Sequence, residues 1–326
     1  MIGVLGGGAW GTALANAMAR GGEDALIWAR EAEVVASINR NHENRTFLPG
    51  ISLDPKVRAT GMTGELAACD VWLVVAPTQH LRAVLAESPV AHAPTLVLCA
   101  KGIEARTRLL MSEVARQVAA ACPIAVLSGP TFAHEVAAGL PTAVTLACED
   151  TALGERLAAR LSRPALRPYL SDDLIGAEIG GAVKNVLAIG CGVVIGAGLG
   201  ENARAALIAR GFAEMTRYGV ARGASPETLA GLSGLGDLVL TCGSAQSRNM
   251  SLGLALGQGA TAKAALAGKS SIAEGAATAP VLADDAARRG VDMPIVAAVA
   301  DLLAGRIATS AAIERLLRRP LKAERG

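Results

Sequence analysis

The sequence of 326 residues contains few aromatic side chains, since only 2% of its residues are Phe, Trp or Tyr. Hydrophobic residues nevertheless make up 52% of the chain, so the core must be built from Ala, Val, Leu and Ile. Small side chains of this kind favour helices that pack closely against one another. A chain of this length is long for one core, and it predicts two domains of ordinary size.

The chain also lacks an excess of charge of either sign. Its formal net charge is +2 at pH 7, and no stretch interleaves Lys or Arg with aromatic residues. Nucleic-acid binding is therefore disfavoured, because it needs a basic face. Internal repeats and low-complexity segments are absent apart from a general alanine bias.

Patterns typical of metal sites and disulfides are missing as well. The six cysteines are widely spaced, without a C-x-x-C pair and without histidines at zinc-ligand spacing. We expect reduced thiols in the core, as in a cytoplasmic protein, and no metal site.

The sequence predicts no membrane insertion. Met1 leads straight into an apolar run, without the basic segment and cleavage site of a signal peptide. The most apolar later stretch, residues 186–200, is shorter than the roughly 20 residues of a spanning helix. We expect its glycines to break it, and we expect a soluble, cytoplasmic protein.

The first dozen residues have the pattern of a dinucleotide-binding fingerprint. Gly6, Gly8 and Gly11 have the spacing G-x-G-x-x-G, between an apolar run at residues 2–5 and an alanine-rich helical segment. In this motif the first glycine turns the chain, the second admits a pyrophosphate, and the third lets helix and strand pack closely. The phosphates are expected on the free amides of the helix N-terminus. The spacing alone is weak evidence, because a chain with 37 glycines can contain it by chance. The prediction therefore rests on the position of the motif between an apolar run and a helical segment.

Six further apolar runs predict strands with helices between them, at residues 25–28, 71–75, 95–99, 124–127, 142–147 and 166–169. This alternation is typical of an α/β fold with a Rossmann-like doubly wound sheet, in which ligands bind at the carboxyl ends of the strands. Lys101, Gly129 and Thr131 follow such ends. The polar residues 39–60 are predicted to form a long ordered loop.

Beyond Ser171 the pattern is helical throughout. We therefore expect a dinucleotide-binding Rossmann domain over residues 1–175 and an all-helical C-terminal, substrate-binding domain over residues 176–326. The boundary falls near Ile175, and the charged tail at 318–326 is expected to fray.

The end of the second predicted strand bears on the choice of cofactor. An enzyme specific for NAD usually places Asp or Glu about 20 residues past the glycines to bind the ribose 2'-hydroxyl. Here the sequence reads Ala29-Arg30-Glu31. Arg30 suits a 2'-phosphate, so NADP(H) is favoured, while Glu31 leaves NAD(H) possible. Alternatively, Arg30 is an ordinary surface charge.

Lys184 is the strongest candidate for acid-base chemistry. On a helix its neighbours three and four positions away are small or apolar, and none is an acid. Such surroundings lower the pKa of a lysine from its reference value of about 10.4 and make it a usable general base. The alternative is that its stem carries the ammonium group out to water.

Two polar clusters follow in the predicted helical domain. Residues 233–238 form a glycine-rich loop that delivers Asp237, which could instead be only a helix N-cap. Ser247-Arg248-Asn249 precede an apolar helix and together suit a phosphate, by an arginine fork and a helix N-terminus. The alternative there is a plain N-cap beside a solvated arginine.

Seven ordered motifs resemble bacterial NAD(P)-dependent glycerol-3-phosphate dehydrogenases from end to end. They are Gly6-Gly7-Gly8-Ala9-Trp10-Gly11-Thr12-Ala13, Phe47-Leu48-Pro49-Gly50, Ala100-Lys101-Gly102, Ser128-Gly129-Pro130-Thr131-Phe132-Ala133, Lys184-Asn185, Leu232-Ser233-Gly234-Leu235-Gly236-Asp237-Leu238 and Ser247-Arg248-Asn249.

The resemblance implies hydride exchange between sn-glycerol 3-phosphate and the nicotinamide, giving dihydroxyacetone phosphate and supplying the phospholipid backbone. It also implies a homodimer, and it makes Lys184 the proton acceptor in oxidation. The substrate contacts that it implies are Lys101, Gly129, Thr131, Lys184, Asp237, Ser247, Arg248 and Asn249. The cofactor contacts are Gly6, Gly8, Ala9, Trp10, Gly11, Arg30, Lys101, Ala133, Arg248, Ile272 and Glu274.

One departure is visible, because many relatives have serine where this chain has Ala9. We expect a modest effect on cofactor affinity, since the backbone amides remain. His134 is the second candidate for acid-base chemistry, but a structural role suits it better. Two other functions stay open: a reductase of an unphosphorylated ketoacid or hydroxyacid, which would not need a phosphate site, and a nucleotide-sensing module without turnover.

Overall fold

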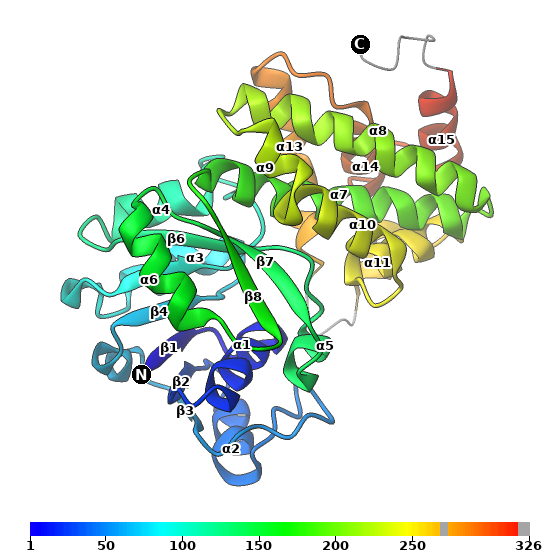
Figure 1. Ribbon diagram of the computed structural model, residues 1–326. Helices are drawn as coiled ribbons and strands as arrows, with labels where there is room; N and C mark the ends of the chain where they lie inside the picture. The colour runs from blue at the N-terminus through cyan, green and yellow to red at the C-terminus, as the bar shows by residue number, and fades with distance from the viewer. Residues whose placement is uncertain (268–272, 319–326) are drawn as a thin grey trace.

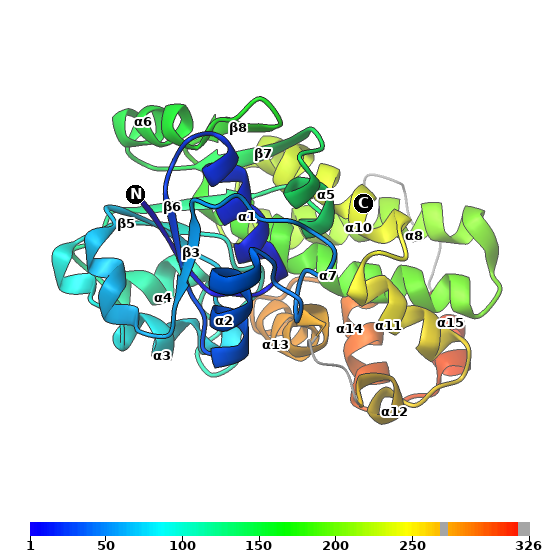
Figure 2. The same ribbon diagram turned by 90° about the horizontal axis from the view of Figure 1, so that it is seen from below.

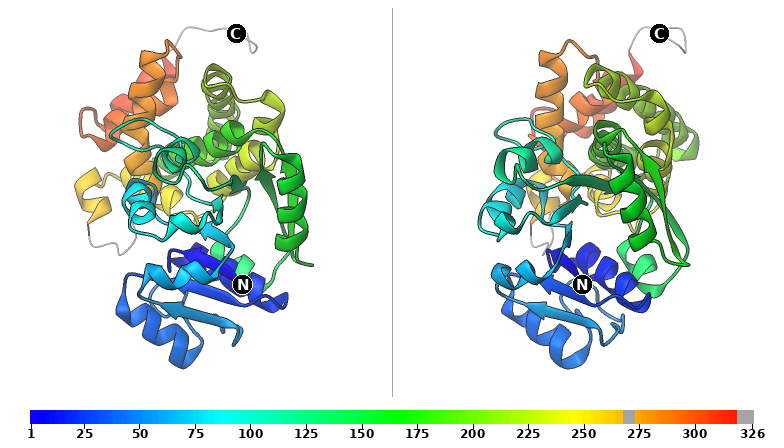
Figure 3. Two further views of the ribbon diagram at one scale, coloured as in Figure 1. Left: turned by 90° about the vertical axis from the view of Figure 1, so that its left-hand side faces the viewer. Right: turned by 60° about the vertical axis from the view of Figure 1, so that its left-hand side comes forward.

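The computed structural model describes residues 1–267 and 273–318 (Figure 1). An eight-stranded sheet flanked by helices forms the N-terminal part, and helices alone form the C-terminal part. Figure 3 shows the blue strands and the red helix α15 (Thr309–Leu317) at opposite ends of the molecule. The expected Rossmann-like sheet followed by an all-helical region is confirmed.

The sheet has the strand order β3-β2-β1-β4-β5-β6-β7-β8. Neighbouring strands are parallel except for β6 and β7, which are antiparallel. The order reverses between β1 and β4, and such a switch point is where open α/β sheets bind ligands. The strands are β1 (Ile2–Leu5), β2 (Ala25–Trp28), β3 (Val57–Thr60), β4 (Val71–Val74), β5 (Thr95–Leu98), β6 (Ile124–Ser128), β7 (Thr142–Ala147) and β8 (Leu166–Ser171).

Helices cover both faces of this sheet, because alternate side chains of each strand point to opposite faces. Val4 packs in one core with Leu14 of α1, whereas Leu5 packs in the other with Leu81 of α3 and Val114 of α4. The helices of this part are α1 (Ala9–Arg20), α2 (Ala32–Asn41), α3 (Leu81–Ala86), α4 (Met111–Val118), α5 (Ala133–Ala138) and α6 (Thr151–Leu161), with 3-10 turns η1 (Thr63–Ala68), η2 (Thr78–His80) and η3 (Val90–His92).

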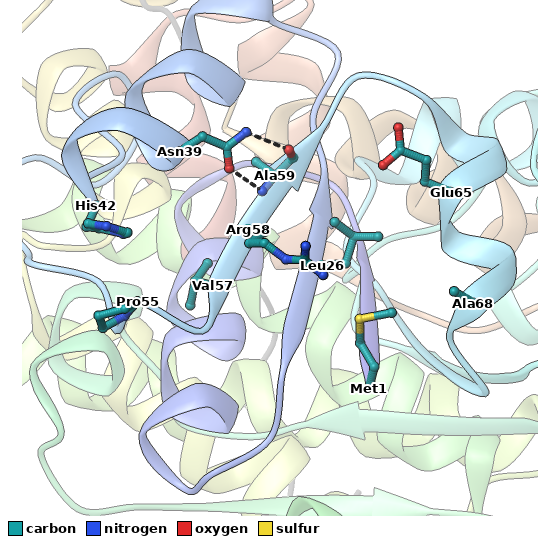
Figure 4. A pocket seen from close by; sticks show the side chains of 10 residues that line it. All are labelled: Met1, Leu26, Asn39, His42, Pro55, Val57, Arg58, Ala59, Glu65 and Ala68. Carbon is teal, nitrogen blue, oxygen red and sulfur yellow. Dashed lines mark hydrogen bonds between the residues drawn. The ribbon is translucent and has the colours of Figure 1, made fainter.

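The edge strand β3 corrects the prediction of a loop over residues 39–60. It is only four residues long and includes the charged Arg58, so no apolar run announces it. Asn39 donates its side-chain amide to the Ala59 carbonyl and accepts from the Ala59 N–H, both at 2.8 Å (Figure 4). A side chain thereby covers part of an edge that would otherwise be unpaired. These residues border an open surface cavity of about 610 Å³ that Met1 and Glu65 also line.

The C-terminal part is built around the 23-residue helix α7 (Leu174–Gly196), which lies at the junction with the sheet (Figure 2). A π-helical turn, η4 (Leu232–Gly236), leads into α10. The remaining helices are α8 (Gly200–Ala221), α9 (Pro226–Ala230), α10 (Asp237–Gly243), α11 (Arg248–Gly257), α12 (Ala262–Leu266), α13 (Glu274–Arg288) and α14 (Pro294–Leu303).

The glycines of α7 do not break the helix, contrary to expectation, because they let other helices pack closely against it, and Gly192 and Gly196 do so for α11. A Cβ atom at Gly192 would lie 2.2 Å from the Met250 carbonyl oxygen, and one at Gly253 would lie 2.0 Å from that of Ile189. Helix α7 is long and apolar enough to cross a membrane, but 89% of its most apolar window is buried inside the protein. It is therefore the core helix of this part.

Helix α7 contributes to both cores. Its first turns place Leu174 and Ala177 against the sheet, and from Ile179 onward its side chains belong to the helical core. We propose the division into domains over 1–175 and 176–326, which falls in the first turn of α7, just after β8. Residues 319–326 of the tail that was expected to fray lie outside the described residues.

Candidate active site

The glycine loop between β1 and α1 has the features of a dinucleotide cradle. A Cβ atom at Gly11 would lie 2.0 Å from the Gly6 carbonyl oxygen, so helix and strand meet as the motif requires. The space around Gly8 is open, with no heavy atom within 4 Å of a Cβ placed there. Gly8 is the residue before α1 and has no side chain to cap the first amides of the helix, which remain for an anion.

Two side chains complete this part of the site. The Asn44 amide donates to the Gly7 carbonyl at 2.8 Å and to the Thr12 hydroxyl at 2.8 Å, which fixes the loop. The indole Nε1 of Trp10 is buried and has no hydrogen-bond partner among the described residues. A closely packed loop, free amides and an unpartnered donor all fit a dinucleotide. Ala9 begins α1.

Arg30 lies two residues beyond β2, at the same carboxyl edge of the sheet. Its side chain is 77% exposed and pairs with Glu31 at 3.1 Å. Glu31 is the N-cap residue of α2, but its side chain makes no cap hydrogen bond. Both side chains flank the region where an adenosine ribose is expected.

A buried cluster of two lysines and one aspartate joins the sheet to the helices. Lys101, just beyond β5, donates from Nζ to Asp237 Oδ2 at 2.7 Å and to the Gly129 carbonyl at 3.0 Å. Lys184, on α7, donates to Asp237 Oδ1 at 2.5 Å and to the Thr241 hydroxyl at 3.0 Å. The Asp237 side chain is 0% exposed and the Lys184 side chain 7%. One carboxylate therefore holds an ammonium group from each part of the chain.

Burial is the main influence on Lys184. It lowers the pKa of Lys184 to about 8, because a buried ammonium group loses its hydration. The Asp237 carboxylate opposes this shift and the positive charge of Lys101 adds to it. A lysine with such a pKa can accept or donate a proton near neutral pH.

These contacts decide two of the open alternatives. Lys184 does not carry its ammonium group to water, because a partner 53 positions away in the sequence holds it inside. Asp237 is the first residue of α10, after Gly236, and its side chain accepts from two lysines and from Thr241 instead of capping the helix. Thr241 was not foreseen, although its place four residues after Asp237 on one helix face is a usable signal.

At the start of α11, the predicted phosphate motif Ser247-Arg248-Asn249 has two residues with contacts inside the protein and one exposed residue. Ser247 is an N-cap whose hydroxyl accepts from the Met250 N–H at 3.2 Å, as the plain alternative held. Asn249 is buried and donates to the Asn185 side chain at 2.9 Å, while it accepts from the Gly275 N–H at 3.0 Å. Arg248 alone of the three motif residues has an exposed side chain.

Glu274, the first residue of α13, comes close to the lysine cluster. Burial raises the pKa of its carboxyl, against the opposing influence of the positive charges on Arg248, Lys101 and Lys184. The structure thus brings Glu274 of α13 near three positive charges, which are Lys101 after β5, Lys184 on α7 and Arg248 on α11. Ile272, which the resemblance placed beside Glu274, lies outside the described residues.

The loop after β6 supplies the remaining candidate residues. Gly129 offers its carbonyl to Lys101, and a Cβ at this glycine would lie 2.9 Å from the Val144 Cα. The Thr131 hydroxyl donates to the Gly129 carbonyl at 3.2 Å, and Ala133 begins α5. His134 is exposed on α5 and takes no part in the lysine cluster.

Comparison with known proteins assigns the family. A family model described as the N-terminus of NAD-dependent glycerol-3-phosphate dehydrogenase matches residues 1–154, and one described as its C-terminus matches residues 173–314. The chain belongs to the NAD-dependent glycerol-3-phosphate dehydrogenase family. The resemblance inferred from the seven motifs is confirmed.

Individual members of this glycerol-3-phosphate dehydrogenase family are similar over nearly the whole chain. A glycerol-3-phosphate dehydrogenase (NAD(P)+) from Erythrobacter litoralis is 61% identical over 323 residues, which cover 99% of this chain and 97% of the relative. One from Caulobacter vibrioides is 60% identical over 326 residues, with 99% and 98% covered.

Solved structures support the same assignment of family and fold. The crystal structure of glycerol-3-phosphate dehydrogenase from Coxiella burnetii has a TM-score of 0.92 and 37% sequence identity, and 98% of each chain is covered. A D-mandelate dehydrogenase with NADH has a TM-score of 0.64 at 14% identity, which shows the fold alone.

Proposed function

We propose that this chain interconverts sn-glycerol 3-phosphate and dihydroxyacetone phosphate, using NAD(P)(H), and so supplies the backbone of glycerophospholipids. The observation that carries the proposal is the buried Lys101–Asp237–Lys184 cluster at the carboxyl edge of a sheet that also bears a dinucleotide loop. The names of the relatives in the same family support it.

Hydride exchange with C2 of the substrate is the chemistry that the nicotinamide supplies when bound. The protein must then orient the substrate and move one proton. We assign proton transfer to Lys184, which accepts from the C2 hydroxyl in oxidation and donates in reduction. Asp237 holds Lys184 in place, and Lys101 brings a second positive charge close to the oxygen that develops negative charge.

Binding of the phosphate is assigned to the start of α11. Arg248 supplies the exposed guanidinium group, and the free amides of the helix N-terminus add to it. The side chains of Ser247 and Asn249 hold this turn in shape, so their proposed contact with substrate is through the main chain. Gly129 and Thr131 approach from the sheet side.

The cofactor is assigned to the glycine loop, with Gly6, Gly8, Ala9, Trp10 and Gly11 beside the pyrophosphate. Arg30 favours NADP(H) over NAD(H), because an exposed guanidinium group can meet a 2'-phosphate. The proposed set of cofactor contacts is completed by Lys101, Ala133, Arg248, Ile272 and Glu274. A cytoplasmic homodimer is part of the same proposal.

The decisive experiment follows oxidation of NADPH and NADH by absorbance, with dihydroxyacetone phosphate or an unphosphorylated ketoacid as acceptor. Turnover with dihydroxyacetone phosphate alone supports the proposal. Faster turnover with the ketoacid assigns the chain to the other reductases of this fold, and tight NADPH binding without any turnover assigns it to a nucleotide sensor.

A further inference from the structure

Thr78 is a buried polar residue that the proposed mechanism does not use. It begins the 3-10 turn η2, four residues past the end of β4, and it is 5% exposed. Its hydroxyl oxygen has no hydrogen-bond partner among the residues that the structure describes. An unsatisfied hydroxyl in the interior destabilises a fold, so its presence calls for a partner that arrives from outside.

The surroundings of Thr78 belong to the ligand-binding edge of the sheet. A Cβ atom at Gly102 would lie 2.6 Å from the Thr78 hydroxyl oxygen, so the hydroxyl faces the loop that carries Lys101. The main chain of Thr78 also faces the Glu274 carboxylate and, by hydrogen bonding, opposes the rise in the pKa of that carboxyl. Thr78 thus lies between the loop that follows β5 and the first residue of α13.

The topology indicates which part of a ligand would reach this position. β1 lies between β2 and β4, and its glycine loop is the place for the pyrophosphate. The residues after β2, including Arg30, therefore face the adenosine half of a dinucleotide. The residues after β4 face the other half, which carries the nicotinamide and its ribose.

We infer that the Thr78 hydroxyl is a further cofactor contact, which binds a ribose hydroxyl or the carboxamide on the nicotinamide half of the dinucleotide. A hydroxyl can donate to or accept from either group. The inference rests on the proposed function, because it takes NAD(P)(H) as the ligand. It concerns a residue outside the seven motifs that carry the resemblance.

The test compares Thr78→Val, which removes the hydroxyl but keeps the shape, with Thr78→Ser, which keeps the hydroxyl. Dissociation constants are measured by calorimetry for NADPH and for adenosine 2',5'-bisphosphate, which lacks the nicotinamide half. Thr78→Val is expected to weaken NADPH binding by about threefold to tenfold, the usual worth of one hydrogen bond. Thr78→Ser should stay close to wild type, and neither variant should change binding of the bisphosphate.

Thermal unfolding without ligand supplies a second readout. Thr78→Val should melt at or above the wild-type temperature, because the lost hydroxyl has no partner in the free protein. A lower melting temperature would show a bond within the protein instead. Thr216→Val is the matched control, since its hydroxyl donates to the Phe212 carbonyl at 3.0 Å on α8. This control should leave NADPH binding unchanged.

Unchanged NADPH binding by Thr78→Val, or an equal loss for both ligands, would overturn the inference. Failure of the wild-type protein itself to bind NADPH or NADH would overturn the proposed function. The two failures are therefore distinct.

Discussion

The glycine loop and the lysine cluster lie at one edge of the sheet but present different kinds of group. The loop offers main-chain amides and, farther out, the exposed Arg30. The cluster offers charged side chains that are almost completely buried. The difference separates recognition from chemistry, because burial alters the proton affinity of a side chain, whereas solvent screens the interactions of an exposed charge. Substitutions in the lysine cluster should therefore lower enzymatic activity more than substitutions in the glycine loop or at Arg30.

The strongest test removes the proposed proton acceptor. Lys184→Ala should lower kcat by about 10²-fold or more, the usual range for loss of a general acid-base. Lys56→Ala is the control, because this lysine lies at the surface and donates to the Gly22 carbonyl. Initial rates with dihydroxyacetone phosphate and NADPH measure the effect, and a kcat near that of wild type would refute the assignment of Lys184.

Removal of the exposed arginine of α11 should act on binding instead. Arg248→Ala should raise KM for dihydroxyacetone phosphate by about tenfold or more, since a hydrogen bond to a charged group is worth about 1.5–3 kcal/mol. The control is Arg204→Ala, which removes an ion pair with Glu201 on α8. An unchanged KM for the phosphorylated substrate would dismiss Arg248 as the phosphate-binding residue.

The pH dependence should show which protonation state of Lys184 each direction needs. Oxidation needs the neutral amine, so kcat/KM for glycerol 3-phosphate should fall about tenfold per pH unit below the pKa of about 8. Reduction needs the ammonium form, so kcat/KM for dihydroxyacetone phosphate should fall above that pH. Asp237→Asn should move both limbs to lower pH, because the carboxylate raises the pKa of Lys184. If both limbs of the pH profile stay at the same pH in Asp237→Asn, Lys184 is not the group that transfers the proton.

The smallest effect is expected at Arg30, which is solvated. Arg30→Ala should lower kcat/KM for NADPH by about threefold to tenfold, and it should leave NADH unaffected, because only NADPH carries the 2'-phosphate. The measurement is kcat/KM with NADPH and with NADH, for the wild type and for Arg30→Ala. A preference for NADH that the substitution leaves untouched would contradict the proposed role.

Periodicity and motif position predicted most of the sheet, because parallel strands buried on both faces are continuous apolar runs. β3 was missed because an edge strand needs no such run. The length of α7 was underestimated because its glycines are explained by contacts with distant helices, as with α11 at Gly192. Lys184 and Asp237 were each recognised singly, and each had an ordinary alternative. Only the tertiary fold shows that they are partners, since no local pattern reports a contact across 53 positions.

The sharing of Asp237 between two lysines has a further consequence. Lys101 comes from the sheet and Lys184 from α7, so any relative movement that draws Lys101 away also removes a like charge beside Lys184. The amine then becomes more basic and holds its proton more tightly. Separation of the two halves would therefore raise the pKa of Lys184, and their approach would lower it.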